Sequence, residues 1–178
     1  MSKLTNGIGT GLLLCLVPVL TSAAVLRTEA KRTEDAAASQ AAMLQAMGSS
    51  TSAYKDYMLN CGGCHRFDGE GVARNAVPSF RNSVGLFTHL PEGREYMIRV
   101  PGAAQSLLDN AELANVLNWM VANFSPGAVA SDFRPFTAAE VGAVRPYRFD
   151  DVAAERRQIT TRLLQMGLTP APYLYGSN

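Results

Sequence analysis

The segment that most constrains this chain is a five-residue run that brings two cysteines and a histidine together. Cys61 and Cys64 are separated by Gly62 and Gly63, and His65 follows the second cysteine directly. On a helical turn, two thiols at this spacing can reach one edge of a planar ring, and the imidazole after them faces the centre of that ring. The two glycines keep bulk away from the ring. The run therefore predicts a site for a flat, covalently held cofactor.

A C-x-x-C-H run is typical of c-type haem attachment. In such a site both thiols form thioether bonds with the vinyl groups of one haem, and the histidine binds the iron from the proximal side. We therefore expect one covalent haem c at Cys61 and Cys64, with His65 as the proximal iron ligand. No other part of the chain carries a comparable motif.

Three other chemistries stay open for the same residues. Cys61 and Cys64 could form a disulfide in an oxidising compartment. They could also be a redox-active pair, although such pairs normally begin a helix that follows a strand, and the chain has no βαβ pattern. A closed zinc site would need a fourth ligand, and His89 is the only other histidine. Haem attachment is favoured because haem is attached after export and the N-terminus carries an export pattern.

The N-terminus has the pattern of a secretory signal peptide over residues 1–24. A lone lysine precedes an apolar run at residues 8–20, and small residues then suit cleavage after Ala24. The run is shorter than the ~20 residues that a transmembrane helix needs, and Pro18 interrupts it. We expect a periplasmic protein, with an uncleaved anchor as the alternative and as the only source of membrane contact. Cys15 would leave with the leader.

The remaining chain divides into three parts. Residues 25–52 are rich in Ala, Gln, Ser, Thr and charge, and they predict a flexible or helical arm, with a short helix over 33–47 and a linker over 48–52. Residues 53–124 form the expected compact domain, and residues 125–178 form a helical C-terminal extension. No segment alternates as a strand would, so the fold class is all-α. The formal net charge of +1 offers no basic field for nucleic acid.

Local signals define the helices of the domain and the extension. Pro91 suits the first turn of a helix that ends near residue 99. Asp109 and Glu112 form a capping box for the final helix of the domain. In the extension, Ile159 and Leu163 share one side of a helix with residue 166, and we expect that side to pack on the domain.

Further features connect this pattern with a known family. An aromatic helix with Tyr57 leads into the cysteine motif, Pro78 follows it, and Trp119 lies in the last helix of the domain. Over residues 53–124 the chain resembles class I c-type cytochromes, single-haem proteins exported by bacteria. The resemblance implies a few helices wrapped around haem. It also implies that the carbonyl of Pro78 accepts a hydrogen bond from the proximal histidine and that Trp119 packs on the first helix.

The chain departs from this family at the second axial ligand. The family presents a distal methionine from the loop before the last helix, and the corresponding loop, residues 101–108, contains none. We expect Met97, on the preceding helix, to be the distal ligand, with His89 as the alternative and an open or water-bound site as the third interpretation. Met120 is interpreted as a core residue. This ligand decides between electron transfer and ligand chemistry.

The predicted function is periplasmic electron transfer between a dehydrogenase or membrane complex and an acceptor, through redox partner proteins. No nucleophile, base and orienting group accompany the motif, so we expect an electron carrier or an electron-transfer subunit rather than an enzyme. The alternative is a haem sensor or peroxidase-like protein with an open distal site. One or two of five arginines could neutralise the haem propionates: Arg66, Arg74, Arg81, Arg94 and Arg99.

Overall fold

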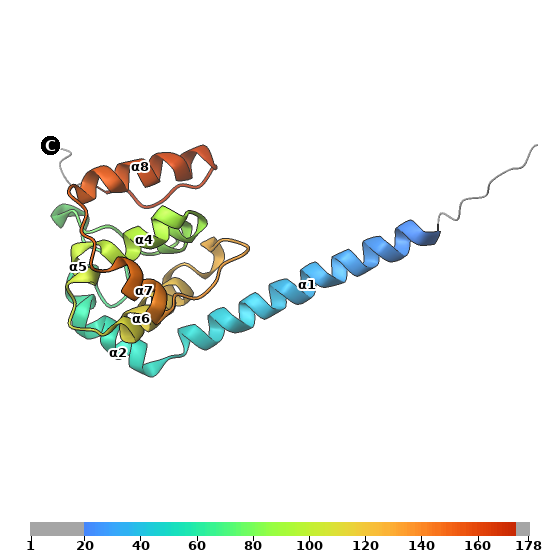
Figure 1. The fold of residues 1–178 in the computed structure, drawn as a ribbon, viewed down its shortest axis with the longest axis horizontal. Helices are drawn as coiled ribbons and strands as arrows, with labels where there is room; N and C mark the ends of the chain where they lie inside the picture. Colours follow the sequence, from blue (N-terminus) through green and yellow to red (C-terminus); the bar gives the residue numbers. More distant parts are fainter. Residues whose placement is uncertain (1–19, 174–178) are drawn as a thin grey trace, which may run out of the picture. The chain divides into compact units, whose positions relative to one another are not determined.

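A computed structural model describes the backbone of residues 20–173 and the side chains of residues 23–173 (Figure 1). Every regular element within this part of the chain is a helix, and a single isolated antiparallel bridge joins Val72 and Val77. The predicted all-α fold class is therefore confirmed. None of the helices in the described part is long and apolar enough to span a membrane. The chain divides into two compact units, residues 1–39 and residues 40–178.

The helix α1 (Leu20–Gly48) begins in the first unit and ends in the second. It is longer than the helix predicted over residues 33–47, because the preceding residues are also rich in strong helix formers such as Ala, Arg, Glu and Lys. Most of the expected signal peptide, residues 1–19, lies outside the described residues, and its cleavage stays a prediction. Within the second unit, Leu44 of α1 is buried in the core.

The predicted linker over residues 48–52 is wrong in its extent. Only Ser49 and Ser50 separate α1 from α2 (Thr51–Asn60). The hydroxyl of Ser50 accepts a hydrogen bond from the backbone N–H of Ala53 and caps α2. Serine is common in linkers but is also a good N-cap residue. Because Ser50 caps the helix, Thr51 is already part of the first helical turn.

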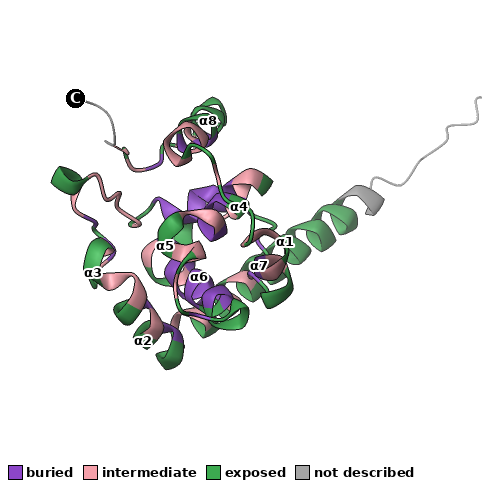
Figure 2. Cartoon of the chain, turned by 60° about the vertical axis from the view of Figure 1, so that its left-hand side comes forward, coloured by how far each residue is buried: buried purple, intermediate pink, exposed green. Residues whose placement is uncertain are grey.

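The central element of the second unit is α6 (Asn110–Phe124), most of which is buried (Figure 2). Asp109 and Glu112 make both halves of the predicted capping box, which fixes where the helix begins. Trp119 packs on α2 as the resemblance implied, with its ring 5.1 Å from that of Tyr57. The apolar face of the helix is buried throughout: Leu113, Val116, Leu117 and Met120.

The helix α4 (Pro91–Arg99) begins and ends where the sequence predicted. It packs on η2 (Val84–His89), a short 3₁₀ helix, at a point of unusually close approach. A Cβ atom at Gly93 would overlap the carbonyl oxygen of Phe87, so only glycine allows this packing. The chain then turns at Val100 into α5 (Pro101–Ala104), which begins the loop before α6.

The C-terminal extension is joined to the domain by α7 (Ala138–Val144), which follows the short turn η3 (Pro126–Ala128). Just before α7, buried Asn118 of α6 pairs with the backbone of Phe136. The Asn118 side chain donates to the Phe136 carbonyl at 3.0 Å and accepts from its N–H at 2.7 Å. Both backbone polar groups of Phe136 are therefore satisfied by a side chain of α6, and these two bonds hold the extension on the domain.

The last helix, α8 (Val152–Gln165), packs on α4 and η2 (Figure 1). Ile159 and Leu163 are buried as predicted, but Met166 is 51% exposed. Met166 follows the end of α8, where the chain leaves the helical direction at Gly167 with a φ of 77°. Its side chain therefore no longer shares the helix face that packs on the domain.

Candidate functional site

The two cysteines and the histidine of the motif lie on a single short turn. Cys61 ends α2 and begins α3 (Gly62–His65), and its carbonyl accepts a hydrogen bond from the His65 N–H at 2.9 Å. Both cysteines are free thiols: Cys61 is half-buried and Cys64 is exposed. Burial, with the nearby Cys64, raises the pKa of Cys61 to about 11, so this thiol is protonated at neutral pH.

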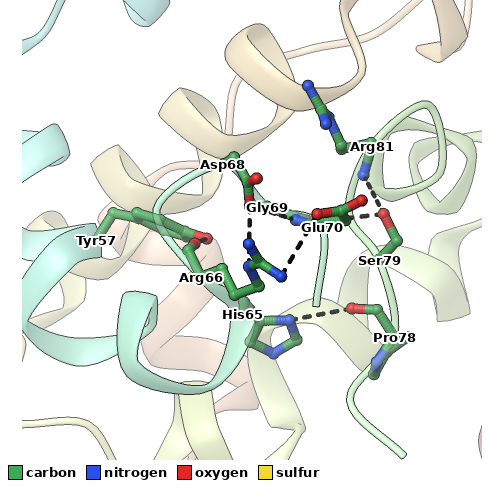
Figure 3. Close-up of polar contacts among 9 residues, drawn as sticks. All are labelled: Tyr57, His65, Arg66, Asp68, Gly69, Glu70, Pro78, Ser79 and Arg81. Carbon is green, nitrogen blue, oxygen red and sulfur yellow. Dashed lines mark hydrogen bonds and ion pairs between the residues drawn. The ribbon is translucent and has the colours of Figure 1, made fainter. Parts of the chain in front are cut away.

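The imidazole of His65 is fixed in one orientation (Figure 3). Its Nδ1 lies 3.2 Å from the carbonyl oxygen of Pro78, the contact that the resemblance implied. A carbonyl can only accept, so Nδ1 carries the proton and the lone pair of Nε2 is left for a metal. The ring of Phe80 stacks on the imidazole with the ring centres 3.8 Å apart. Burial lowers the pKa of His65 to about 4, so the ring is neutral near pH 7, as a metal ligand must be.

The loop after α3 brings Pro78 to His65 through a tight turn. Gly71 has a φ of 71°, and a Cβ atom there would lie 2.5 Å from the carbonyl oxygens of Val77 and Pro78. The Gly71 N–H donates to the His65 carbonyl at 3.0 Å. Only glycine fits at this position, so it is as much a part of the site's architecture as the proline.

Polar contacts from the first helix of the domain hold the start of this loop (Figure 3). The Tyr57 hydroxyl donates to the carbonyl of Arg66 at 2.6 Å, and Arg66 has a φ of 65°. The Arg66 side chain forms exposed ion pairs with Asp68 at 3.7 Å and Glu70 at 3.6 Å, which contribute little to stability. The buried hydroxyl of Tyr57 is the stronger anchor, and burial also raises its pKa.

A cavity of about 330 Å³ opens beside the motif, within the size range of cofactor pockets. It brings the three motif residues together with two methionines, Met97 of α4 and Met120 of α6. Both methionines are buried. Met120 was interpreted as core alone, because helical periodicity cannot distinguish a side chain that faces a core from one that faces a cavity.

The other distal candidates are placed differently. His89 is not among the residues that line the cavity, and its Nε2 lies 3.1 Å from the carbonyl oxygen of Ala128. The loop before α6 contributes Pro101, Gly102 and Ala103 to the cavity, and none of these can ligate a metal through a side chain. The structure therefore brings Met97 to the cavity and leaves His89 outside it.

None of the five arginines considered from the sequence lines this cavity. Three of them have other partners. Arg66 forms the exposed ion pairs described above, and Arg94 forms a two-pronged ion pair with Glu140, with both N–O distances 2.8 Å. Arg99 donates to the backbone carbonyls of Tyr147 and Arg148. The arginine at the cavity is Arg156 of α8, which the sequence analysis missed. It lies three residues before Ile159 and therefore on the apolar side of the helix. This position is visible in the sequence and could have identified Arg156 as an inward-facing arginine.

The residues around the cavity fit an iron porphyrin. Two thiols and a neutral imidazole with a free Nε2 lie at one edge, apolar side chains form most of the walls, and a buried guanidinium lies in the lining. The Nε atom of Arg156 is buried without a hydrogen-bond partner in the described part of the chain, which suits a group that brings its own carboxylates. No group of three or more His, Cys, Asp or Glu among the described residues could hold a metal ion.

Comparison with known proteins also supports a haem-binding protein, and specifically the class of c-type cytochromes. The chain is similar to a cytochrome c-552 from Thermus thermophilus, with 29% identity over 119 residues that cover 56% of this chain and 90% of that protein. A second cytochrome c-552, from a particular strain of the same species, is also 29% identical over 119 residues, and 80% of its length is covered. No family model and no solved structure matches the chain.

Proposed function

We propose that this chain is an exported, single-haem cytochrome that transfers electrons in the periplasm. The observation that carries the proposal is the placement of His65, held through Nδ1 by Pro78, on one turn with Cys61 and Cys64 at a cavity. Haem, when bound, would supply one-electron chemistry at its iron. Cys61 and Cys64 would hold it through thioether bonds, and Nε2 of His65 would bind the iron.

We further propose Met97 as the distal ligand. Its side chain is buried, it lines the cavity, and it lies on α4, the helix before the loop that supplies the distal methionine in the family that this chain resembles. Met120 lines the same cavity from α6 and is the necessary comparison. His89 was the alternative from the sequence, and its contact with the Ala128 carbonyl argues against it.

A role as an electron carrier or electron-transfer subunit is supported by the exposure of the motif. Cys64 is exposed and His65 next to it is half-buried, so the attached edge of the cofactor would lie near the surface. An edge near the surface lets a redox partner approach while the iron stays in an apolar environment. The proposed partners are a dehydrogenase or membrane complex as donor and a second protein as acceptor.

The absorption spectrum of the reduced holoprotein tests this function, with and without carbon monoxide. We expect a six-coordinate, low-spin spectrum that carbon monoxide does not change, and a haem that stays on the chain after denaturation. Met97→Ala should convert the spectrum to a form that binds carbon monoxide, whereas Met120→Ala and His89→Ala should not. Haem that is lost on denaturation of the wild type would refute the attachment.

The second candidate is a haem sensor or peroxidase-like protein with an open distal site. It is favoured by one observation, the loop at residues 101–108, which faces the cavity with Pro101, Gly102 and Ala103 and has no methionine. High-spin character and ready binding of carbon monoxide by the wild type would support this candidate and exclude transfer through a saturated iron.

A further inference from the structure

Arg156 is an arginine in the interior of the protein, where charged side chains are rare. It is 6% exposed, it comes from α8 in the extension, and it lines the same cavity as His65. One terminal nitrogen, Nη2, donates to the carbonyl of Ala171 at 3.1 Å, and the guanidinium lies 4.3 Å from the centre of the Phe87 ring. The Nε atom is buried and has no hydrogen-bond partner in the described residues.

The surroundings of Arg156 supply no negative charge within the described part of the chain. The polar side chains close to it are Tyr96 from α4 and Tyr173 from the C-terminal segment, whose ring centres lie 5.7 and 5.8 Å from the guanidinium carbon. The imidazole of His65 lines the same cavity. No ion pair is formed between Arg156 and a carboxylate of residues 23–173. A buried cation without a counter-charge is strongly destabilising, because it has lost its hydration without a compensating partner.

The neighbouring arginines of α8 show the contrast. Arg157 forms an ion pair with Asp151 and has a side chain that is 66% exposed. Arg162 forms an ion pair with Glu92 and is 56% exposed. Of the arginines of α8, the one that faces the cavity is the one that lacks a carboxylate among the described residues. Guanidinium matches a carboxylate with two parallel hydrogen bonds, so the missing partner is best supplied by a carboxylate inside the cavity.

We propose that Arg156 binds a propionate of the haem, through Nε and a terminal nitrogen of its guanidinium. The inference rests on the proposed haem attachment. It makes the C-terminal extension part of the cofactor site, because α8 provides the arginine and the segment after it holds the arginine in place. The Ala171 carbonyl accepts from Arg156, and the Ala171 N–H donates to the buried hydroxyl of Ser83 at 2.8 Å.

The proposed contact would affect the reduction potential of the haem. A fixed positive charge near the iron favours the reduced state, which has one positive charge fewer than the oxidised state. Removal of the guanidinium would leave the propionate negative and unpaired, which favours the oxidised state. Arg156 is therefore expected to raise the reduction potential of the bound haem.

The experiment compares the full-length holoprotein with Arg156→Gln, Arg156→Lys and the matched control Arg157→Gln, which removes an exposed charge from the next position. Two quantities are measured: the midpoint reduction potential, and the resonance Raman band of the propionate bend, which reports hydrogen bonds to that carboxylate. Covalent haem is quantified in each variant after denaturation.

We expect Arg156→Gln to lower the midpoint potential and shift the Raman band. Arg156→Lys should keep most of the potential, because it keeps the charge, but should still shift the band, because it lacks the two-pronged donor. Arg157→Gln should change neither, since an exposed charge is screened by water and salt.

Two results would overturn the inference while leaving the proposed function intact. One is an Arg156→Gln protein that carries covalent haem and has the same midpoint potential and the same Raman band as the Arg157→Gln control. That result would mean that the guanidinium only packs on Phe87. If Arg156→Gln does not fold, an unchanged band in Arg156→Lys would have the same meaning. A wild type without covalent haem would instead refute the proposed function itself.

Discussion

Arg145 holds the loop that lines part of the candidate site, and its removal should measurably destabilise the protein. The residue follows α7, and its guanidinium reaches back to three backbone carbonyls of the loop before α6. Nε donates to the Ala104 carbonyl at 3.0 Å, and the two terminal nitrogens donate to the Leu108 carbonyl at 2.7 Å and the Ser106 carbonyl at 2.8 Å. A single side chain from the extension therefore fixes the loop between α5 and α6.

The size of the effect follows from these three bonds. Hydrogen bonds to a charged group are worth ~1.5–3 kcal/mol each. The carbonyls of Ala104 and Ser106 belong to half-buried residues, so water can replace part of each bond. At ~1 kcal/mol for each carbonyl, Arg145→Ala should reduce the free energy of unfolding by ~3 kcal/mol. With a urea m-value of ~2 kcal/mol per M, the unfolding midpoint should fall by ~1.5 M.

Urea unfolding of the holoprotein, followed by circular dichroism, measures this change. The matched control is Arg148→Ala, because Arg148 is exposed and its side chain makes no hydrogen bond or ion pair in the described residues. Its midpoint should move by less than ~0.3 M, since surface substitutions usually change stability by less than ~0.5 kcal/mol. Arg145→Lys should lie between the two, because a single ammonium cannot reach three separated carbonyls. Equal midpoints for Arg145→Ala and Arg148→Ala would refute the reasoning.

Two further substitutions test how the extension and α4 are packed. Asn118→Ala removes two buried hydrogen bonds to the backbone of Phe136 and should reduce the free energy of unfolding by ~2–4 kcal/mol. Asn115→Ala, on the exposed side of the same helix, should be neutral in the same urea titration. Similar losses of stability in the two variants would contradict the pairing of Asn118 with Phe136. Gly93→Ala places a Cβ against the backbone of η2 and should lower the melting temperature, while Gly102→Ala, which has open space around it, should leave it unchanged or slightly raised. A Gly93→Ala protein as stable as the wild type would show that α4 can move away from η2.

The helix ends were predictable where the signal lies in adjacent residues. Pro91 fixed the start of α4, and Asp109 with Glu112 fixed the start of α6, because proline at the first turn and a capping box act on the backbone within one turn. The linker prediction failed at Ser50 for a related reason. The same serine-rich run can be a flexible connection or a helix cap, and packing of α2 on the core selects the cap.

The residues on the motif side of the cavity could be predicted from the sequence, whereas on the opposite wall only Met97 was predicted. Cys61, Cys64 and His65 are neighbours in sequence, and the resemblance supplied Pro78. Across the cavity, the lining side chains come from helices far apart in the chain. Met97 and Met120 are both apolar residues on buried helix faces, and only tertiary packing shows that both of these faces reach the cavity.

Sequence proximity also failed to identify the arginine that lines the cavity. Five arginines of the compact domain were the natural candidates for the cofactor's carboxylates, because they lie close to the motif in sequence. Arg94 is instead committed to Glu140, an acidic residue of the extension, with its guanidinium 4.0 Å from the Phe136 ring centre. The extension thus occupies an arginine of the domain and supplies Arg156 to the cavity in its place. An arginine on the apolar side of a helix is unfavourable unless a polar group lies beneath it, so the position of Arg156 in the sequence is itself a signal of a polar group next to α8.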